Sequence, residues 1–179
     1  MTPYFIIVGR SASGKTTIME KLMDYYHFSR TVTSTTREAR NEENQESYHF
    51  ISIEEFKDTT FVETVEYVGS YYGTSKDSVD SSDIVAVEIE GAKALKNYCE
   101  EINRPCVIIG LDVSRHIAEK RMLARGDNLI DIRKRLEYDD KLFKDFSGIC
   151  DIFFYDFNME LDFPILCNCI DVILADVIK

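Results

Sequence analysis

The chain has 179 residues, of which 45% are apolar, and its formal net charge is −11. This length predicts one compact unit with inserted subdomains rather than two independent domains, and the apolar content excludes disorder by composition. The acidic balance argues against a nucleic-acid-binding protein, which normally has a basic face. Because we find neither a charged-then-apolar leader nor an apolar run of about eighteen residues, we expect a cytoplasmic protein without a membrane span. The odd number of cysteines predicts reduced thiols.

The first segment of the chain has the pattern of a phosphate-binding loop. An apolar strand is predicted over residues 4–8, and the pattern Gly-x-x-x-x-Gly-Lys-Thr follows at 9–16, before a helix. Glycines let backbone N–H groups turn toward phosphate oxygens, and the helix N-terminus adds a positive dipole. Lys15 can reach the β- and γ-phosphates, while the Thr16 hydroxyl is placed to hold Mg²⁺. We therefore predict that a nucleoside triphosphate binds to Gly9, Arg10, Ser11, Ala12, Ser13, Gly14, Lys15, Thr16 and Thr17.

Residues 32–83 have a different pattern from the segments around them. Short β-branched and aromatic runs alternate with polar turns, which predicts a small, mostly β insertion. Strands are predicted at 32–36, 48–51 and 61–68, and a short helix at 53–57. Ser52 is positioned as the N-cap of this helix, with Glu55 three residues on, as in a capping box. We expect His49 to pack beside Tyr48 and assign no catalytic role to the histidines.

An alternation of strands and helices resumes after the insertion. Strands are predicted at 84–88, 106–111 and 152–155, and helices at 17–26, 91–98, 115–124, 129–146 and 166–178. Ser114 can cap one of these helices, and Arg125-Gly126-Asp127-Asn128 interrupts the helical pattern. Apolar strands that alternate with helices predict an α/β fold with a parallel sheet and helices on both faces.

Seven motifs, in order along nearly the whole chain, resemble those of the guanylate kinase family. They are the loop at 9–16, Ser34-Thr-Thr-Arg37-x-x-Arg40, Ser47-Tyr-His-Phe50, Phe61-Val-Glu63, Gly69-Ser-Tyr-Tyr-Gly-Thr74, Glu88-Ile-Glu-Gly91 and Arg121-x-x-x-Arg125-Gly126. The resemblance implies a P-loop nucleoside monophosphate kinase core at 1–31 and 84–179, a GMP-binding insertion at 32–83 and a short lid at about 122–134. It also implies Mg²⁺-dependent transfer of the ATP γ-phosphate to GMP or dGMP, giving ADP and GDP.

The resemblance further implies roles for individual residues. The phosphate of GMP is assigned to Arg37, Arg40, Tyr48 and Tyr72, and guanine to Thr33, Glu63 and Thr74, with Glu88 nearby. The catalytic set is Lys15, Arg37, Arg121, Arg125 and Arg135, with Arg133 a neighbour, and the metal ligands are Thr16 and Glu88. The chemistry supports Glu63, because a carboxylate accepts hydrogen bonds from both N1–H and the 2-amino group of guanine. Adenine offers no such pair of donors, so the buried carboxylate would be left unpaired.

The chain departs from the family pattern at four places: the lid turn between Arg125 and Arg135 is slightly shorter than expected, Thr33 stands where serine is commoner, and the other two concern the metal and adenine. Ala86 and Glu88 stand where the family has Asp-x-Asp, which changes the carboxylates available to a metal. Near the last predicted strand, Tyr155-Asp156 stand where an asparagine often approaches adenine, so adenine contacts are left unassigned.

Two alternatives to a guanylate kinase remain at this point. One is a related phosphopeptide-binding module that has lost catalysis; the intact Lys15, Thr16, Arg121 and Arg125 and the absence of a predicted flanking interaction domain weigh against it. The other is a P-loop kinase with a different phosphorylated acceptor, which the loss of the first aspartate at Ala86 keeps open. The expected partners are ATP and GMP or dGMP, with no nucleic acid or membrane, in a monomer or homodimer.

Overall fold

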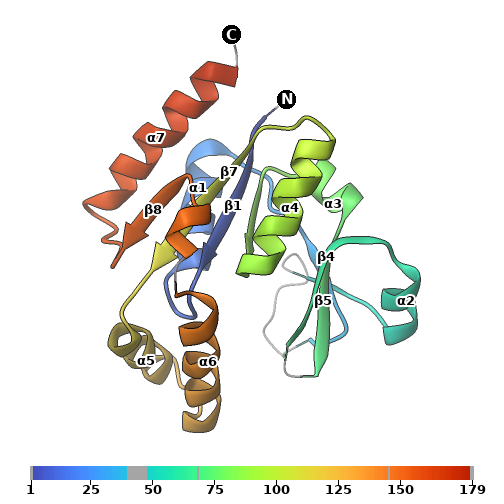
Figure 1. The fold of residues 1–179 in the computed structure, drawn as a ribbon, viewed down its shortest axis with the longest axis vertical. Coiled ribbons are helices and arrows are strands. Elements are labelled where there is room, and N and C mark those ends of the chain that lie inside the picture. Colours follow the sequence, from blue (N-terminus) through green and yellow to red (C-terminus); the bar gives the residue numbers. More distant parts are fainter. Residues whose placement is uncertain (1, 40–47, 68, 145, 178–179) are drawn as a thin grey trace.

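A computed structural model describes residues 2–39, 48–67, 69–144 and 146–177 (Figure 1). Its core is a four-stranded sheet in the order β6-β1-β7-β8, in which all three neighbouring pairs are parallel. The strands are β1 (Tyr4–Gly9), β6 (Ile84–Val87), β7 (Cys106–Asp112) and β8 (Ile152–Tyr155). A parallel bridge between Arg30 and Ile84 extends the edge beside β6. The predicted parallel sheet is confirmed.

Helices cover both faces of this sheet, because β1 is apolar on both sides. Phe5 and Ile7 pack into a cluster with residues of α1 and α7, whereas Tyr4, Ile6 and Val8 pack against α4. The helices are α1 (Lys15–Tyr26), α4 (Ile89–Glu101) and α7 (Asp162–Val177). All six residues of β1 are buried, as a central parallel strand requires. No helix within the described part of the chain is both long and apolar enough to cross a membrane.

The insertion forms a second sheet, in the order β3-β2-β5-β4, beside the core. Its elements are β2 (Thr33–Thr35), β3 (Tyr48–Phe50), α2 (Ile53–Asp58), β4 (Phe61–Tyr67), β5 (Ser70–Ser75) and α3 (Lys76–Asp80). The capping box of α2 is confirmed: the Ser52 amide donates to Glu55 at 2.8 Å and the Glu55 amide donates to the Ser52 hydroxyl at 3.1 Å. The sequence analysis did not predict β5 or α3.

Two helices, α5 (Arg115–Ala124) and α6 (Leu129–Leu142), form a hairpin below the sheet in Figure 1. Ser114 caps α5 as predicted, accepting from the amide of Ile117 at 3.3 Å. The hairpin has a small apolar cluster of its own, to which Ala12 of the phosphate-binding loop also contributes. The segment predicted as a lid, about 122–134, lies within this hairpin.

Five predicted helix boundaries were wrong by two or more residues, among them the start of α1 at Lys15 and the end of α4 at Glu101. Helix α6 ends at Leu142 rather than 146, before a 3₁₀ turn (Phe146–Ile149) that contains Ser147 and Gly148, both poorer helix formers. Helix α4 begins at Ile89, two residues before its predicted start at Gly91. Helix α7 begins at Asp162, and Asn158 accepts from the amides of Glu160 and Leu161 just ahead of it, at 2.9 and 3.1 Å. Pro164 lies in the first turn of α7, where a missing N–H is tolerated.

Candidate active site

One cavity of about 990 Å³ lies between the core sheet, the insertion and the α5–α6 hairpin. It opens at the carboxyl ends of β1 and β6, the usual place for a ligand in a parallel sheet. Most of the predicted site residues line it: Ser11–Thr17, Thr33, Arg37, Tyr48, Glu63, Tyr72, Glu88, Arg121, Arg125 and Arg135. The predicted residues Gly9, Arg10 and Thr74 and the neighbour Arg133 do not, and Arg40 lies outside the described residues.

The phosphate-binding loop curls around the side chain of its own lysine. The Lys15 ammonium donates to the carbonyls of Gly9 at 2.6 Å and Arg10 at 3.0 Å. Burial lowers the pKa of Lys15, and the negative charges of Glu88 and Asp139 oppose this shift. The loop uses two left-handed backbone positions, at Gly14 (φ 101°) and Ala12 (φ 58°). Glycine adopts that region freely, whereas an alanine there is strained.

Glu88 lies where β6 ends and α4 begins, facing the phosphate-binding loop across the cavity. It is the N-cap residue of α4, yet its side chain makes no capping bond. Its Oε2 is buried without a hydrogen-bond partner among the described residues. Burial raises the pKa of Glu88, while the neighbouring Lys15 lowers it. A buried carboxylate oxygen without a partner among the described residues, together with the hydroxyl-bearing Thr16 on the same cavity, fits Mg²⁺, which takes few protein ligands when phosphates supply others.

Glu63 forms the far end of the same cavity, on β4 of the insertion. The residue is 9% exposed, and the Thr74 hydroxyl donates to its Oε1 at 2.7 Å. Burial raises the pKa of Glu63, and the bond from Thr74 counteracts this shift. A Cβ atom on Gly91 would lie 3.2 Å from Oε2, so the glycine leaves space for the carboxylate. Thr74 lies behind Glu63 and orients it.

Aromatic rings surround the guanidinium of Arg37 near the middle of the cavity. Its Cζ lies 5.6 Å from the ring centre of Tyr48 and 5.7 Å from that of Phe50, within cation–π distance. The rings of Tyr48 and Tyr72 meet edge to face at 6.1 Å. Arg37 therefore lies close to Tyr48, which in turn contacts Tyr72, and all three line the same cavity.

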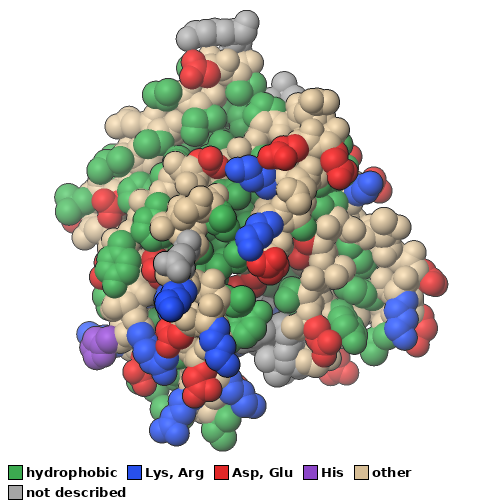
Figure 2. All heavy atoms as spheres, viewed as in Figure 1, with side chains coloured by type: hydrophobic (Ala, Val, Ile, Leu, Met, Phe, Trp, Pro, Cys, Tyr) green, Lys and Arg blue, Asp and Glu red, His purple; other side chains and the backbone are tan. Residues whose placement is uncertain are grey.

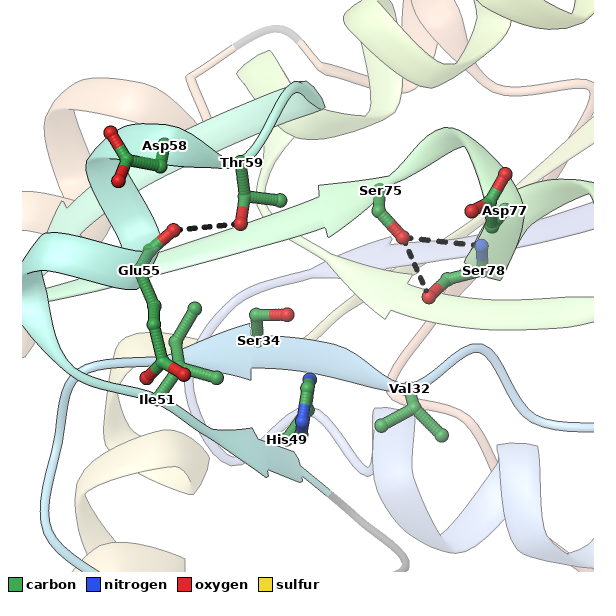
Figure 3. A pocket seen from close by; sticks show the side chains of 10 residues that line it. All are labelled: Val32, Ser34, His49, Ile51, Glu55, Asp58, Thr59, Ser75, Asp77 and Ser78. Carbon is green, nitrogen blue, oxygen red and sulfur yellow. Dashed lines mark hydrogen bonds between the residues drawn. The ribbon is translucent and has the colours of Figure 1, made fainter.

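The prediction that His49 packs beside Tyr48 was wrong. Successive residues of a strand point to opposite faces of a sheet, so His49 points away from the large cavity that Tyr48 lines. It faces a second, smaller cavity of about 550 Å³ on the other side of the insertion (Figure 3).

Helix-end contacts occupy much of the polar lining of this second cavity. Glu55 belongs to the capping box of α2, and Ser75 caps α3 by accepting from the Ser78 amide at 3.2 Å. The Thr59 hydroxyl donates to the Glu55 carbonyl at 2.7 Å, as Figure 3 shows. We assign this cavity a structural role.

The arginines of the hairpin line the opposite wall of the large cavity, and Figure 2 shows Lys and Arg side chains gathered over α5 and α6. Arg121 donates to the carbonyl of Ala12 at 2.9 Å. Arg125 donates through two nitrogens to Asp127, at 2.9 and 2.5 Å, and Arg135 lies 3.6 Å from the same carboxylate. Two of the three hairpin arginines in the predicted catalytic set, Arg125 and Arg135, thus share one aspartate.

Several lining residues were missed by the sequence analysis, among them Arg30, Asn158 and Asp139. Arg30 and Asn158 reach the cavity from segments that carry no recognisable local pattern. Asp139 did leave a signal, because it is the single charged member of the buried stripe of α6 that contains Ile132 and Leu136. A charge at a core position of a helix is rare enough to be noticed.

Comparisons with known proteins agree with this arrangement. A family model described as guanylate kinase matches residues 1–144. The guanylate kinase of Clostridium acetobutylicum is 38% identical over 133 residues, which are 68% of this chain but only 62% of that protein. The guanylate kinase of Porphyromonas gingivalis is 34% identical over 158 residues, covering 79% of this chain and 82% of the other. The solved structure of guanylate kinase from Anaplasma phagocytophilum, 20% identical, matches with a TM-score of 0.67 over 97% of this chain and 86% of its own, and shows the same fold. The chain belongs to the guanylate kinase family.

Proposed function

We propose that this protein transfers the γ-phosphate of ATP to GMP or dGMP, giving ADP and GDP. One observation carries the proposal: the phosphate-binding loop and the buried carboxylate of Glu63 line the same cavity. A loop of this kind suits a triphosphate, and a buried carboxylate suits the paired donors of guanine. Both nucleotides then lie in one cavity, which a direct transfer requires. Because all five cysteines are free thiols, we also propose that the protein works in the cytoplasm.

On the donor side, the loop amides and Lys15 bind the triphosphate. Lys15 exchanges its hydrogen bonds to two loop carbonyls for hydrogen bonds to phosphate oxygens. The new bonds are stronger, because both the ammonium and the phosphate oxygens are charged. Thr16 and Glu88 would hold Mg²⁺, which when bound neutralises charge on the phosphates. Phe157, Asn158 and Met159 line the same cavity and are candidates for the nucleoside end of ATP.

On the acceptor side, Arg37 with Tyr48 and Tyr72 binds the phosphate of GMP, and we keep Arg40 as a further predicted contact. A guanidinium fork and phenol hydroxyls satisfy several oxygens of a dianion. Glu63, held by Thr74, accepts from N1–H and the 2-amino group of guanine. Thr33 lines the cavity from strand β2, which pairs with the other side of β5, and completes this end.

The transfer itself needs positioning and charge more than covalent chemistry by the protein. Arg121, Arg125 and Arg135 approach from the hairpin, where they balance negative charge on the moving group. Arg125 must exchange Asp127 for phosphate oxygens to do so. Movement of the hairpin also excludes water, which would otherwise hydrolyse ATP.

The proposal is tested by coupled measurement of ADP formation with Mg²⁺ and ATP, in the presence of GMP, dGMP, AMP or UMP. We expect turnover that depends on GMP or dGMP, with little for AMP and UMP. Arg125→Ala should lower kcat by about 10³-fold or more, the usual effect of removing an arginine finger, while GMP affinity changes little. GMP binding without turnover would instead support the phosphopeptide-binding module, and comparable rates with AMP would remove the role given to Glu63.

A further inference from the structure

The α5–α6 hairpin holds the outer half of the phosphate-binding loop at three consecutive residues. The Arg10 guanidinium pairs with Asp140 at 2.7 Å, the Ser11 amide donates to Oδ2 of Asp139 at 2.8 Å, and the Ala12 carbonyl accepts from Arg121 at 2.9 Å. Two of these contacts come from exposed side chains, which contribute little in water. The bond from Ser11 to Asp139 is different, because its acceptor is buried.

Asp139 occupies a position that packing alone would give to an apolar residue. It is 3% exposed and follows Ile132 and Leu136 at helical spacing on the buried stripe of α6. A carboxylate at such a position is unfavourable unless it has partners. Its partners come from the phosphate-binding loop: the amide of Ser11 donates to it at 2.8 Å, and the Ser11 side chain, Lys15 and Arg10 lie close enough to oppose the rise in pKa that burial causes. The loop is thus what compensates for burying this charge.

We propose that Asp139 is a positioning residue for the phosphate donor, which sets the outer half of the phosphate-binding loop by fixing the amide of Ser11. The inference rests on the proposed function, because it concerns the ATP end of the same cavity. Asp139 acts through the loop, since one of its oxygens is already used by Ser11. The bond between Asp139 and Ser11 couples α6 to the phosphate-binding loop. The position of α6 and the conformation of the donor site therefore depend on each other.

The amide bond, rather than the charge alone, is the feature that the proposal requires. Asp139→Asn keeps an oxygen that can accept from Ser11, whereas Asp139→Ala removes it. Glu137→Ala is a matched control, because Glu137 is an exposed acidic residue on the same helix. If Asp139→Ala does not fold, Asp139→Leu replaces it, since leucine suits the apolar stripe and still offers no acceptor.

The variants are compared by hydrogen exchange of the Ser11 amide, by calorimetric titration with ADP, and by steady-state kinetics. In Asp139→Ala we expect faster exchange at Ser11 and a loss of about tenfold in ADP affinity, the upper end of the range for one unmade hydrogen bond. The KM for ATP should rise by a similar factor, while the KM for GMP stays nearly constant. Asp139→Asn and Glu137→Ala should behave like the unaltered protein in exchange and in ADP binding.

Two results would overturn the inference. One is unchanged Ser11 exchange and ADP affinity in Asp139→Ala; the other is an Asp139→Asn variant as impaired as Asp139→Ala, which would show that the charge and not the bond matters. A third result concerns only the proposed function: if the unaltered protein shows no GMP-dependent turnover, that function fails. Exchange at Ser11 and ADP titration would still decide the role of Asp139.

Discussion

At the scale of single residues, Glu63 combines a functional advantage with a cost in stability. Burial raises the pKa of Glu63 in the folded protein, so the folded state favours the protonated form more than the unfolded state does. The carboxylate therefore lowers stability progressively as the pH rises from the unfolded pKa, about 4.3, through the raised folded value. We expect that Glu63→Gln, which is neutral at every pH, raises Tm at pH 7.5 and that this gain disappears near pH 4.

The same substitution should weaken the recognition of guanine. Glutamine retains one acceptor but places an N–H donor against the donors of the base, so we expect the KM for GMP to rise by about tenfold to a hundredfold. Glu66→Gln is the control, since Glu66 is exposed on the same strand. Thermal melting at the two pH values and the GMP dependence of ADP formation provide the measurements. A variant that is no more stable at pH 7.5, or that keeps its GMP affinity, would contradict this account.

At the scale of elements, Arg104 ties the end of the insertion to the core. Arg104 is buried, with 6% of the residue exposed. Its guanidinium donates to the carbonyls of Thr2 at 3.0 Å, Val79 at 2.7 Å and Ser82 at 2.7 Å. It also lies 4.9 Å from the ring centre of Tyr4. Helix α3 and the start of β1 are therefore joined by one side chain.

We expect Arg104→Ala to lower the free energy of unfolding by about 3 kcal/mol, because it leaves buried carbonyls without donors. Arg104→Lys should restore only part of this, since an ammonium cannot reproduce the planar fork. Urea denaturation measures both, with Lys93→Ala as the control: Lys93 pairs with Glu90 on the surface and should change stability by less than about 0.5 kcal/mol. Equal effects of the alanine variants at 93 and 104 would show that the three hydrogen bonds from Arg104 to backbone carbonyls contribute nothing to stability.

The elements that could be predicted from the sequence are those whose signals are local. Strand β1 is a run of apolar residues before glycine, and the capping box of α2 lies within four residues. Strand β5 and helix α3 were missed for different reasons. The residues of β5 form a strand because they pair with β2 and β4. Helix α3 has only five residues, which are too few to show a helical period.

The site was predictable to the extent that a motif specifies a backbone shape. Lys15 and Glu63 line one cavity, as the resemblance implied, although Lys15 begins helix α1 of the core and Glu63 lies on strand β4 of the insertion. What could not be predicted depends on tertiary contact: Asp139 meets Ser11 across 128 residues of chain, and His49 faces away from Tyr48 once β3 pairs with β2. The role of Arg40 stays a prediction.

At the scale of the whole molecule, the cavity joins three units that hold different parts of the proposed reaction. The core supplies Lys15, the insertion supplies Glu63 and the hairpin supplies Arg125. A cavity of about 990 Å³ that is open between these units admits water, whereas phosphoryl transfer to GMP requires water to be excluded. The overall acidic charge of −11 makes the basic lining of the cavity the natural place for two anionic nucleotides.

We therefore expect the molecule to become more compact only when both nucleotides are present. Small-angle X-ray scattering should show a smaller radius of gyration with GMP and a non-hydrolysable ATP analogue together than with either alone. The reason is that each ligand alone bridges the core to one mobile unit, whereas the pair draws the hairpin and the insertion toward the same phosphates. Arg125→Ala, studied at concentrations that saturate it with both nucleotides, provides the control, because it lacks the guanidinium that pulls the hairpin inward. An equal decrease in the radius of gyration of Arg125→Ala would show that other contacts cause the closure. An unchanged radius in the unaltered protein would show that water is excluded without domain movement.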